Sequence, residues 1–364
     1  MDEEIGLAWR PVPLALQAVT PEELSAAVPG VTLAEARKLV AMVHRDEPVM
    51  PSSAVRKTSA LAVKAAGHTP RLTVVEEEAS AVDPFVKYQL ESEGQRFETV
   101  RIPLADPRRF SVCVSSQVGC ALGCRFCATG RLGLLRNLAA WEIVEQVREV
   151  RRRLPHGRVH GVVFQGMGEP LANLDSVLAA IRVLTEPCAQ GIDGRAITVC
   201  TSGLPQQIRR LARAAPAARL GLSLGSARAE VRRSIMPIDQ AHPLEEVLDA
   251  AAEHAELTGH SPMWAVTLLA GVNDSDDDAR ALAERARAFE ARTRKRPRLS
   301  IIAYNPIGHD DPFTRASDER QAAFRAVLSE HGLPSHRRYS GGSDIAAACG
   351  QLVARGRPRL PVVR

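Results

Sequence analysis

Aromatic side chains are scarce in this chain of 364 residues, where Phe, Trp and Tyr together make up 4%. This scarcity argues against a protein that binds single-stranded nucleic acid by extensive base stacking. No uncharged apolar run reaches the length of a membrane span, and no repeat or low-complexity segment is visible. The first residues, Met-Asp-Glu-Glu-Ile, lack the basic and apolar regions of a secretory signal. We therefore expect a cytoplasmic protein without a membrane partner.

The charge balance of the chain is mild. Charged residues make up 24% and hydrophobic residues 45%, which are the proportions of an ordinary globular protein. The length allows one large domain and a smaller one. The formal net charge of +5 favours a polyanionic partner, and arginine, the better residue for bidentate phosphate contacts, supplies most of the positive charge. An arginine-rich composition bias is the alternative explanation.

The chain has seven cysteines, and three of them, Cys120, Cys124 and Cys127, are closely spaced. An odd number and this spacing argue against a disulfide framework and indicate a reducing compartment. Thiolates are the usual protein ligands of iron–sulfur clusters, and three of them leave one iron of a [4Fe–4S] cubane open. The expected ligand of that iron is S-adenosylmethionine, bound through its amino and carboxylate groups. A structural zinc site with a fourth ligand elsewhere, or a set of buried thiols, is the alternative.

Residues 1–95 differ from the rest and predict a small helical accessory domain. The segment 21–40 reads as two short helices around a Pro29-Gly30 turn, with Thr32 as the N-cap of the second helix. Such a pair either contacts a phosphate backbone or is a plain packing unit. Around 72–77 and 85–91 the spacing of apolar residues shortens toward alternation with polar ones, which predicts a hairpin that leads into the main domain.

From about residue 110 strands and helices alternate. Strands are expected at 110–115, 160–165, 196–200, 220–224, 264–268, 299–304 and 337–339. Helices are expected at 138–150, 174–184, 205–214, 244–257, 277–291 and 319–331. Such alternation calls for a parallel sheet with right-handed crossovers. We therefore predict an α/β fold, a partial (β/α) barrel over 96–352, followed by a basic tail over 353–364.

Polar and glycine-rich loops follow the expected strands, at the end where (β/α) barrels assemble their active sites. One of them is Gly166-Met-Gly-Glu-Pro. Its glycines allow the backbone to approach a ligand closely, and Glu169 would accept hydrogen bonds from an ammonium group. A tight turn with a solvated glutamate is the alternative.

Two further cysteines stand apart from the cysteine loop, and each taken singly would be a core thiol. Cys113 lies on the strand before that loop, and Cys349 lies near the C-terminus. Their segments, however, resemble the RlmN/Cfr family of radical S-adenosylmethionine RNA methyltransferases over 98–352, about 70% of the chain. The matching segments include Cys113-Val-Ser-Ser-Gln-Val-Gly-Cys-Ala-Leu-Gly-Cys-Arg-Phe-Cys, Gly166-Met-Gly-Glu-Pro-Leu, Thr201-Ser-Gly, Asn305-Pro and Ala348-Cys-Gly-Gln-Leu.

The resemblance implies a two-stage methylation of an adenine ring carbon in RNA. One S-adenosylmethionine methylates Cys349, and a second is cleaved at the cluster to a radical that takes hydrogen from this methyl group. The methylene radical adds to the adenine, and Glu98 removes the ring proton, although on sequence alone Glu98 would be a surface glutamate. Cys113 then attacks the sulfur of Cys349, which releases the product and leaves a Cys113–Cys349 disulfide. A thiol reductant and an electron donor for the cluster are implied partners.

The resemblance also assigns residues that border the bound S-adenosylmethionine, namely Gly168, Glu169, Cys200, Ser223 and Asn305. The chain departs from the family pattern at two nearby positions, because the family commonly has serine at Cys200 and histidine at Gly225. Cys200 offers only weak hydrogen bonds, and Gly225 offers backbone but no imidazole. The cluster and the cysteine chemistry are untouched by these departures.

The implied substrate is C2 of an adenosine in rRNA, with tRNA as a second substrate, and the implied enzyme is a monomer. Methylation at C8, or of another RNA, is the alternative within the class. A zinc-bearing RNA-binding module without catalysis is the alternative outside it. The basic runs 148–153 and 292–298 would contact RNA phosphates, unless they are solvated helix ends.

Overall fold

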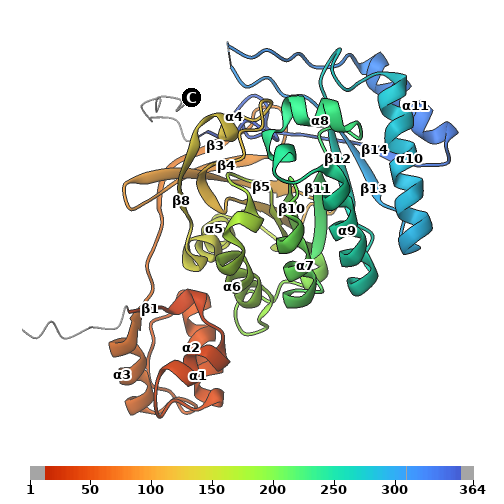
Figure 1. Cartoon of the computed structure of the whole chain (residues 1–364). Coiled ribbons are helices and arrows are strands. Elements are labelled where there is room, and N and C mark those ends of the chain that lie inside the picture. Colours follow the sequence, from red (N-terminus) through yellow and green to blue (C-terminus); the bar gives the residue numbers. More distant parts are fainter. Residues whose placement is uncertain (1–12, 309, 354–364) are drawn as a thin grey trace, which may run out of the picture. The chain divides into compact units, whose positions relative to one another are not determined.

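The computed structural model describes residues 13–308 and 310–353 (Figure 1). These residues form two compact units, one comprising the chain up to Arg71 together with Arg182–Gly191, and the other comprising Leu72–Ile181 and the chain from Ile192 onward. Apart from Val353, the basic tail expected at 353–364 lies outside the described residues. Within the described part of the chain, no helix is both long enough and apolar enough to cross a membrane.

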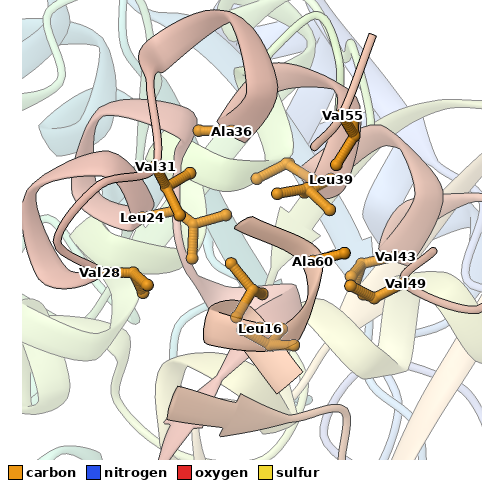
Figure 2. Close-up of a cluster of buried hydrophobic side chains, with 12 residues drawn as sticks. Leu16, Leu24, Val28, Val31, Ala36, Leu39, Val43, Val49, Val55 and Ala60 are labelled. Carbon is orange, nitrogen blue, oxygen red and sulfur yellow. The ribbon is translucent and has the colours of Figure 1, made fainter. Parts of the chain in front are cut away.

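The smaller unit is built on three helices, α1 (Pro21–Ala27), α2 (Leu33–His44) and α3 (Lys57–Ala66), with a two-stranded pairing of β1 (Leu14–Ala15) and β2 (Gly67–His68). The helix pair expected around the Pro29-Gly30 turn is α1 and α2. Thr32 caps α2 as expected, since its side chain accepts from the N–H of Glu35 and the Glu35 carboxylate accepts from the N–H of Thr32. Figure 2 shows the apolar side chains that these helices bury together, among them Leu24 and Leu39.

The larger unit contains a ten-stranded sheet in the order β14-β13-β12-β11-β10-β9-β6-β5-β4-β3. In this sheet β6 and the strands from β9 to β14 pair in parallel, as the alternating pattern predicts. Their bounds are β6 Arg109–Val114, β9 Arg158–Phe164, β10 Ile197–Thr201, β11 Arg219–Ser223, β12 Met263–Leu268, β13 Arg298–Ala303 and β14 Ser335–Arg338.

Helices connect the parallel strands, and neighbouring helices pack together, α7 on α9, α9 on α10 and α10 on α11 (Figure 1). Their bounds are α5 Ala140–Arg152, α6 Leu174–Thr185, α7 Pro205–Ala214, α9 Leu244–Thr258, α10 Asp276–Thr293 and α11 Asp318–Glu330. Because helices cover the sheet, its parallel strands are mostly apolar on both faces. The structure confirms the α/β fold predicted from the sequence.

The antiparallel edge of the sheet lies where the sequence predicts accessory structure. The strands β3 (Thr73–Ala79), β4 (Val86–Ser92) and β5 (Gln95–Pro103) form a meander, and β5 pairs with β6. The two units therefore divide at Leu72 and not near residue 95, because the hydrogen bonds of these strands belong to the main sheet. This pairing also places Glu98 on the strand beside Cys113.

Short elements carry the loops at the carboxyl ends of the strands. β7 (Gln117–Cys120) and β8 (Gly133–Asn137) form a separate two-stranded ribbon that encloses the helical turn α4 (Ala128–Arg131). The helix α8 (Ala229–Ile235) follows β11. The alternating pattern did not predict these elements, because each is shorter than the periods that reveal amphipathic structure.

Candidate active site

A cavity of about 230 Å³ lies at the carboxyl ends of the parallel strands. This is the end of the sheet at which the sequence places the site. The cavity brings together most of the expected site residues, whose side chains or backbone line it: Cys113, Cys124, Cys127, Gly168, Glu169, Cys200, Ser223 and Cys349.

The cysteine loop is a tight turn between β7 and α4. Cys120 ends β7, and the N–H of Cys127 donates to the carbonyl of Cys124 at 3.1 Å. Gly130 packs against this turn, and a Cβ at Gly130 would come within 3.0 Å of the backbone N and O of Cys124. A glycine at this position therefore lets the loop close on itself and present Cys124 and Cys127 to the cavity.

The three thiols fit an iron–sulfur cluster better than a single ion. Burial raises the pKa of Cys120 and Cys124 to about 12 and also raises that of Cys127, so ionisation needs a cation such as the irons of a cluster. In residues 13–308 and 310–353, no three His, Cys, Asp or Glu side chains are grouped so that they could hold one metal ion. Three thiolates on different irons of a cubane do not have to converge on one ion, as the ligands of a zinc site do. The three cysteines are therefore compatible with a cluster.

Glu169 is buried beyond the end of β9, with an exposed fraction of 3%. Its Oε1 accepts from the N–H of Leu171 at 3.0 Å, and its Oε2 accepts from the N–H of Ser202 at 2.9 Å. Burial raises the pKa of Glu169 to about 6, and the Ser202 and Leu171 N–H groups partly offset this. The solvated-turn alternative for Glu169 is therefore wrong, and a carboxylate is held at the cavity wall where it can accept from an ammonium group.

Close packing explains the glycine before Glu169. Gly168 has a φ of +99°, and a Cβ at this position would lie 2.5 Å from the Cβ of Gln117. Only glycine adopts this conformation in this space without strain. The backbone at Gly168 thereby forms part of the cavity wall.

The two departures from the family pattern are built into the packing. The Sγ of Cys200 occupies the space over Gly221, where a Cβ would come within 2.8 Å of the sulfur, and burial raises the pKa of Cys200 to about 12. Gly225 has a φ of +69°, and the sulfur of Met236 fills the position that a Cβ would take. Ser223, between these positions, ends β11 at the cavity.

Hydrogen bonds fix the backbone of Cys349 on both sides. Its N–H donates to the Oγ of Ser340 at 3.0 Å, and its carbonyl accepts from the Nδ2 of Asn305 at 3.1 Å. The same Nδ2 donates to the Oγ of Ser340 at 3.0 Å. The structure thus places Asn305, expected at the border of S-adenosylmethionine, on the backbone of Cys349.

The segment after Cys349 is also tied to the cysteine loop. The N–H of Ala128 donates to the carbonyl of Gly350 at 2.8 Å, and the Oγ1 of Thr129 donates to the carbonyl of Leu352 at 2.6 Å. Two segments more than 200 residues apart in sequence are therefore held together at one side of the cavity.

Cys113 lies on β6, is buried, and lines the same cavity as Cys349. Burial raises the pKa of Cys113 to about 12, and the neighbouring Cys349 adds to this effect. All seven cysteines are free thiols in the structure, so the disulfide implied by the resemblance is not present here.

Glu98 is 1% exposed on β5, so the surface position that its residue type suggests is wrong. The buried Nζ of Lys87 lies 3.6 Å from Glu98 and 2.8 Å from Glu78. The same Nζ donates to the carbonyl of Ile345, in the segment that leads to Cys349. Glu98 therefore has the low-water environment that a general base requires.

Sequence reasoning missed three charged residues near the site: Lys87, Arg232 and Arg338. Arg232 is buried with Asp239 at 2.9 Å and donates to the carbonyls of Ser202, at 2.6 Å, and Leu224. It thereby joins the loops that follow β10 and β11. Charged residue types alone predict solvent exposure, so nothing local in the sequence marks these positions.

The basic run 148–153 is largely neutralised within the protein. Arg152 pairs with Glu145 and Glu149, and Arg153 pairs with Glu149 and Glu77. These contacts favour a structural role at the end of α5 over contact with RNA.

The second basic run, 292–298, has acidic partners as well. Arg292 pairs with Asp249 and Glu256, and Arg296 pairs with Glu290. The helix-end alternative is thus favoured for this run too.

The sheet and the cysteine loop define the class of the protein. The family model of the radical SAM superfamily matches residues 114–286, which contain the cysteine loop and the strands from β9 to β12. A solved radical SAM methyltransferase from Sphaerobacter thermophilus superposes with a TM-score of 0.83 at 35% identity, covering 94% of this chain and 100% of that one.

Sequence relatives narrow the class. The chain is 57% identical to a "Probable RNA methyltransferase" of Sorangium cellulosum, over 91% of this chain and 90% of the relative. It is 43% identical to the "Dual-specificity RNA methyltransferase RlmN" of Syntrophobacter fumaroxidans, over 72% of this chain and 74% of the relative. The chain belongs to the RlmN-type family of radical S-adenosylmethionine RNA methyltransferases.

Proposed function

We propose that this enzyme methylates C2 of an adenosine in rRNA, with tRNA as a second substrate, through a methylated Cys349. The observation that carries the proposal is the shared cavity of Cys113 and Cys349, which Cys124, Cys127 and Glu169 also line. A zinc-bearing RNA-binding module has no use for two additional thiols in such a cavity. The need for a thiol reductant and an electron donor is in line with a cytoplasmic enzyme.

The residues fit the two cofactors of the class. Cys120, Cys124 and Cys127 would hold a [4Fe–4S] cluster, and the Glu169 carboxylate beside Gly168 would bind the amino group of S-adenosylmethionine. When bound, these cofactors supply a carbon radical that can act on an unactivated methyl group.

The remaining steps belong to side chains of the chain. Cys349 accepts a methyl group on its sulfur and, after hydrogen removal, becomes bonded to the adenine ring through this carbon. Glu98 takes up the ring proton, and the cluster, when bound, would take back the one electron that the adduct then holds in excess. The Cys113 thiolate then attacks the sulfur of Cys349, so that a sulfur–sulfur bond forms and the sulfur–carbon bond breaks. The electron pair passes to the nucleotide, which takes up a proton, and the reductant restores both thiols.

Mass spectrometry of digested RNA tests the proposal. RNA from cells that express the wild-type protein should contain added 2-methyladenosine, and RNA from cells with Cys349→Ala should not. Cys188→Ala, in the smaller unit, serves as the matched control and should behave as wild type. Added 8-methyladenosine would establish the alternative regiochemistry, and normal methylation by Cys349→Ala would refute the covalent route.

A further inference from the structure

Arg338 is a cationic residue in the cavity without an acidic partner in the described part of the chain. It is the last residue of β14, and its side chain lines the cavity. Its Nη1 is buried and makes no hydrogen bond. A guanidinium with one nitrogen withdrawn from water in this way is stabilised by an anion nearby. The position therefore calls for an anion inside the cavity.

The groups whose charge acts on Arg338 are three thiols, those of Cys113, Cys200 and Cys349. All three residues line the same cavity as Arg338. Cys113 lies on β6 and Arg338 on β14, at opposite ends of the parallel set, and both residues line one cavity. The guanidinium and the thiols influence each other electrostatically. The nearby Cys349 raises the pKa of Arg338. Arg338 in turn lowers the pKa of Cys113 and Cys200, although burial, which raises both, has the larger effect.

We propose that Arg338 is the counter-ion that holds Cys349 as a thiolate and then supports the Cys113 thiolate that attacks it. This inference rests on the proposed function, in which both sulfurs react as thiolates. A thiolate is the reactive form of cysteine, and burial disfavours this form at Cys113. A fixed positive charge offsets the effect of burial and stabilises the thiolate without a neighbouring base.

Alkylation rates of single cysteines test this role without turnover. The anaerobically reconstituted full-length protein is treated with iodoacetamide at neutral pH, and each cysteine peptide is quantified by mass spectrometry over time. Arg338→Met should slow the alkylation of Cys349 by about tenfold or more, since each tenfold loss of thiolate is one unit of pKa. Arg338→Lys keeps the charge and should retain most of the rate.

Arg337→Met is the matched control, because Arg337 precedes Arg338 on β14 and pairs with Asp318 at 2.8 Å. It should leave the rate at Cys349 unchanged. The direction of the change in alkylation rate distinguishes misfolding from loss of the counter-ion. Unfolding exposes thiols and accelerates alkylation, whereas loss of the counter-ion slows it. Cys188 lies in the smaller unit, so its alkylation rate serves as an internal reference for the activity of the reagent.

An unchanged rate at Cys349 in Arg338→Met overturns the proposal. If that variant also binds S-adenosylmethionine or RNA more weakly, the guanidinium serves an anion of the ligand and not a thiolate. Failure of the proposed function has a different signature, namely normal RNA methylation by Cys349→Ala. The two outcomes are therefore measured independently.

Discussion

Lys87 connects the proposed base to the segment that carries Cys349, and Lys87→Met tests this connection. The Lys87 side chain is 3% exposed. Its Nζ faces Glu98 at 3.6 Å and Glu78 at 2.8 Å, and it donates to the carbonyl of Ile345. Methionine preserves most of the side-chain length but removes the charge, so two carboxylates then face each other without the cation between them.

The expected cost follows from this burial. Removing one partner of a buried ion pair costs about 3–5 kcal/mol. The Glu78 side chain is 26% exposed and can be hydrated, so we expect the lower end, about 3 kcal/mol, in the free energy of unfolding of the larger unit. Urea unfolding followed by circular dichroism measures this loss, and Lys87→Arg should recover most of it.

A double-mutant cycle separates the Lys87–Glu98 interaction from general damage to the core. Glu98→Gln removes the charge that Lys87 faces at 3.6 Å, so the double variant should be more stable than the sum of the single losses predicts, by about 1–3 kcal/mol. Additive losses, within about 0.5 kcal/mol, would refute the reasoning. At temperatures where it is folded, Lys87→Met should also accumulate the RNA–protein adduct, because the base is misplaced.

Three further predictions follow from single residues. Cys124→Ala should abolish iron and sulfide binding in chemical analysis, whereas Cys188→Ala should retain both; a full, reducible cluster in the first variant would contradict the site. Cys113→Ala should carry RNA that survives denaturation but not nuclease, and protein free of nucleotide after expression in cells would count against a resolving role. Burial lowers the pKa of His254 from 6.5 to about 4, so at this residue the unfolded state takes up a proton between pH 7 and pH 5 while the native state does not, and the contribution of His254 to stability should fall by about 2 kcal/mol over this range. Glu169, whose pKa is raised to about 6, acts in the opposite direction, so urea unfolding at both pH values should compare wild type with His254→Leu, and the stability difference between them should change by that amount.

The parallel part of the sheet could be predicted from the sequence because its strands are buried on both faces. The segment expected at 264–268 is β12 at Met263–Leu268, and the segment expected at 220–224 is β11 at Arg219–Ser223. Buried parallel strands read as continuous apolar runs between helical periods. The polar loops after these strands could also be assigned to one site, because parallel strands have their carboxyl ends at the same edge of the sheet.

The hairpin predicted around 72–77 and 85–91 is confirmed as the pair of β3 and β4. Its place in the main sheet and the buried charges could not be predicted in this way, because both depend on contacts with segments distant in sequence. The burial of Lys87 depends on the carbonyl of Ile345, 258 residues away in sequence. The environment of Arg338 also depends on distant segments, since its thiol neighbours lie on β6, on β10 and in the segment after β14.

The departures at Cys200 and Gly225 bear on chemistry in different ways. At Gly225 the left-handed backbone strains any other residue, and the sulfur of Met236 would lie 2.4 Å from its Cβ, so the imidazole common in the family would require Met236 to shift. At Cys200 the change from the serine of the family adds a third thiol, beside Cys113 and Cys349, to those whose charge acts on Arg338. Because Gly221 makes room for its sulfur, this thiol is a packed component of the cavity wall. Its charge state is therefore coupled to that of Cys349 through one guanidinium, and replacing Cys200 with serine should leave the positive charge of Arg338 to the two thiols that react.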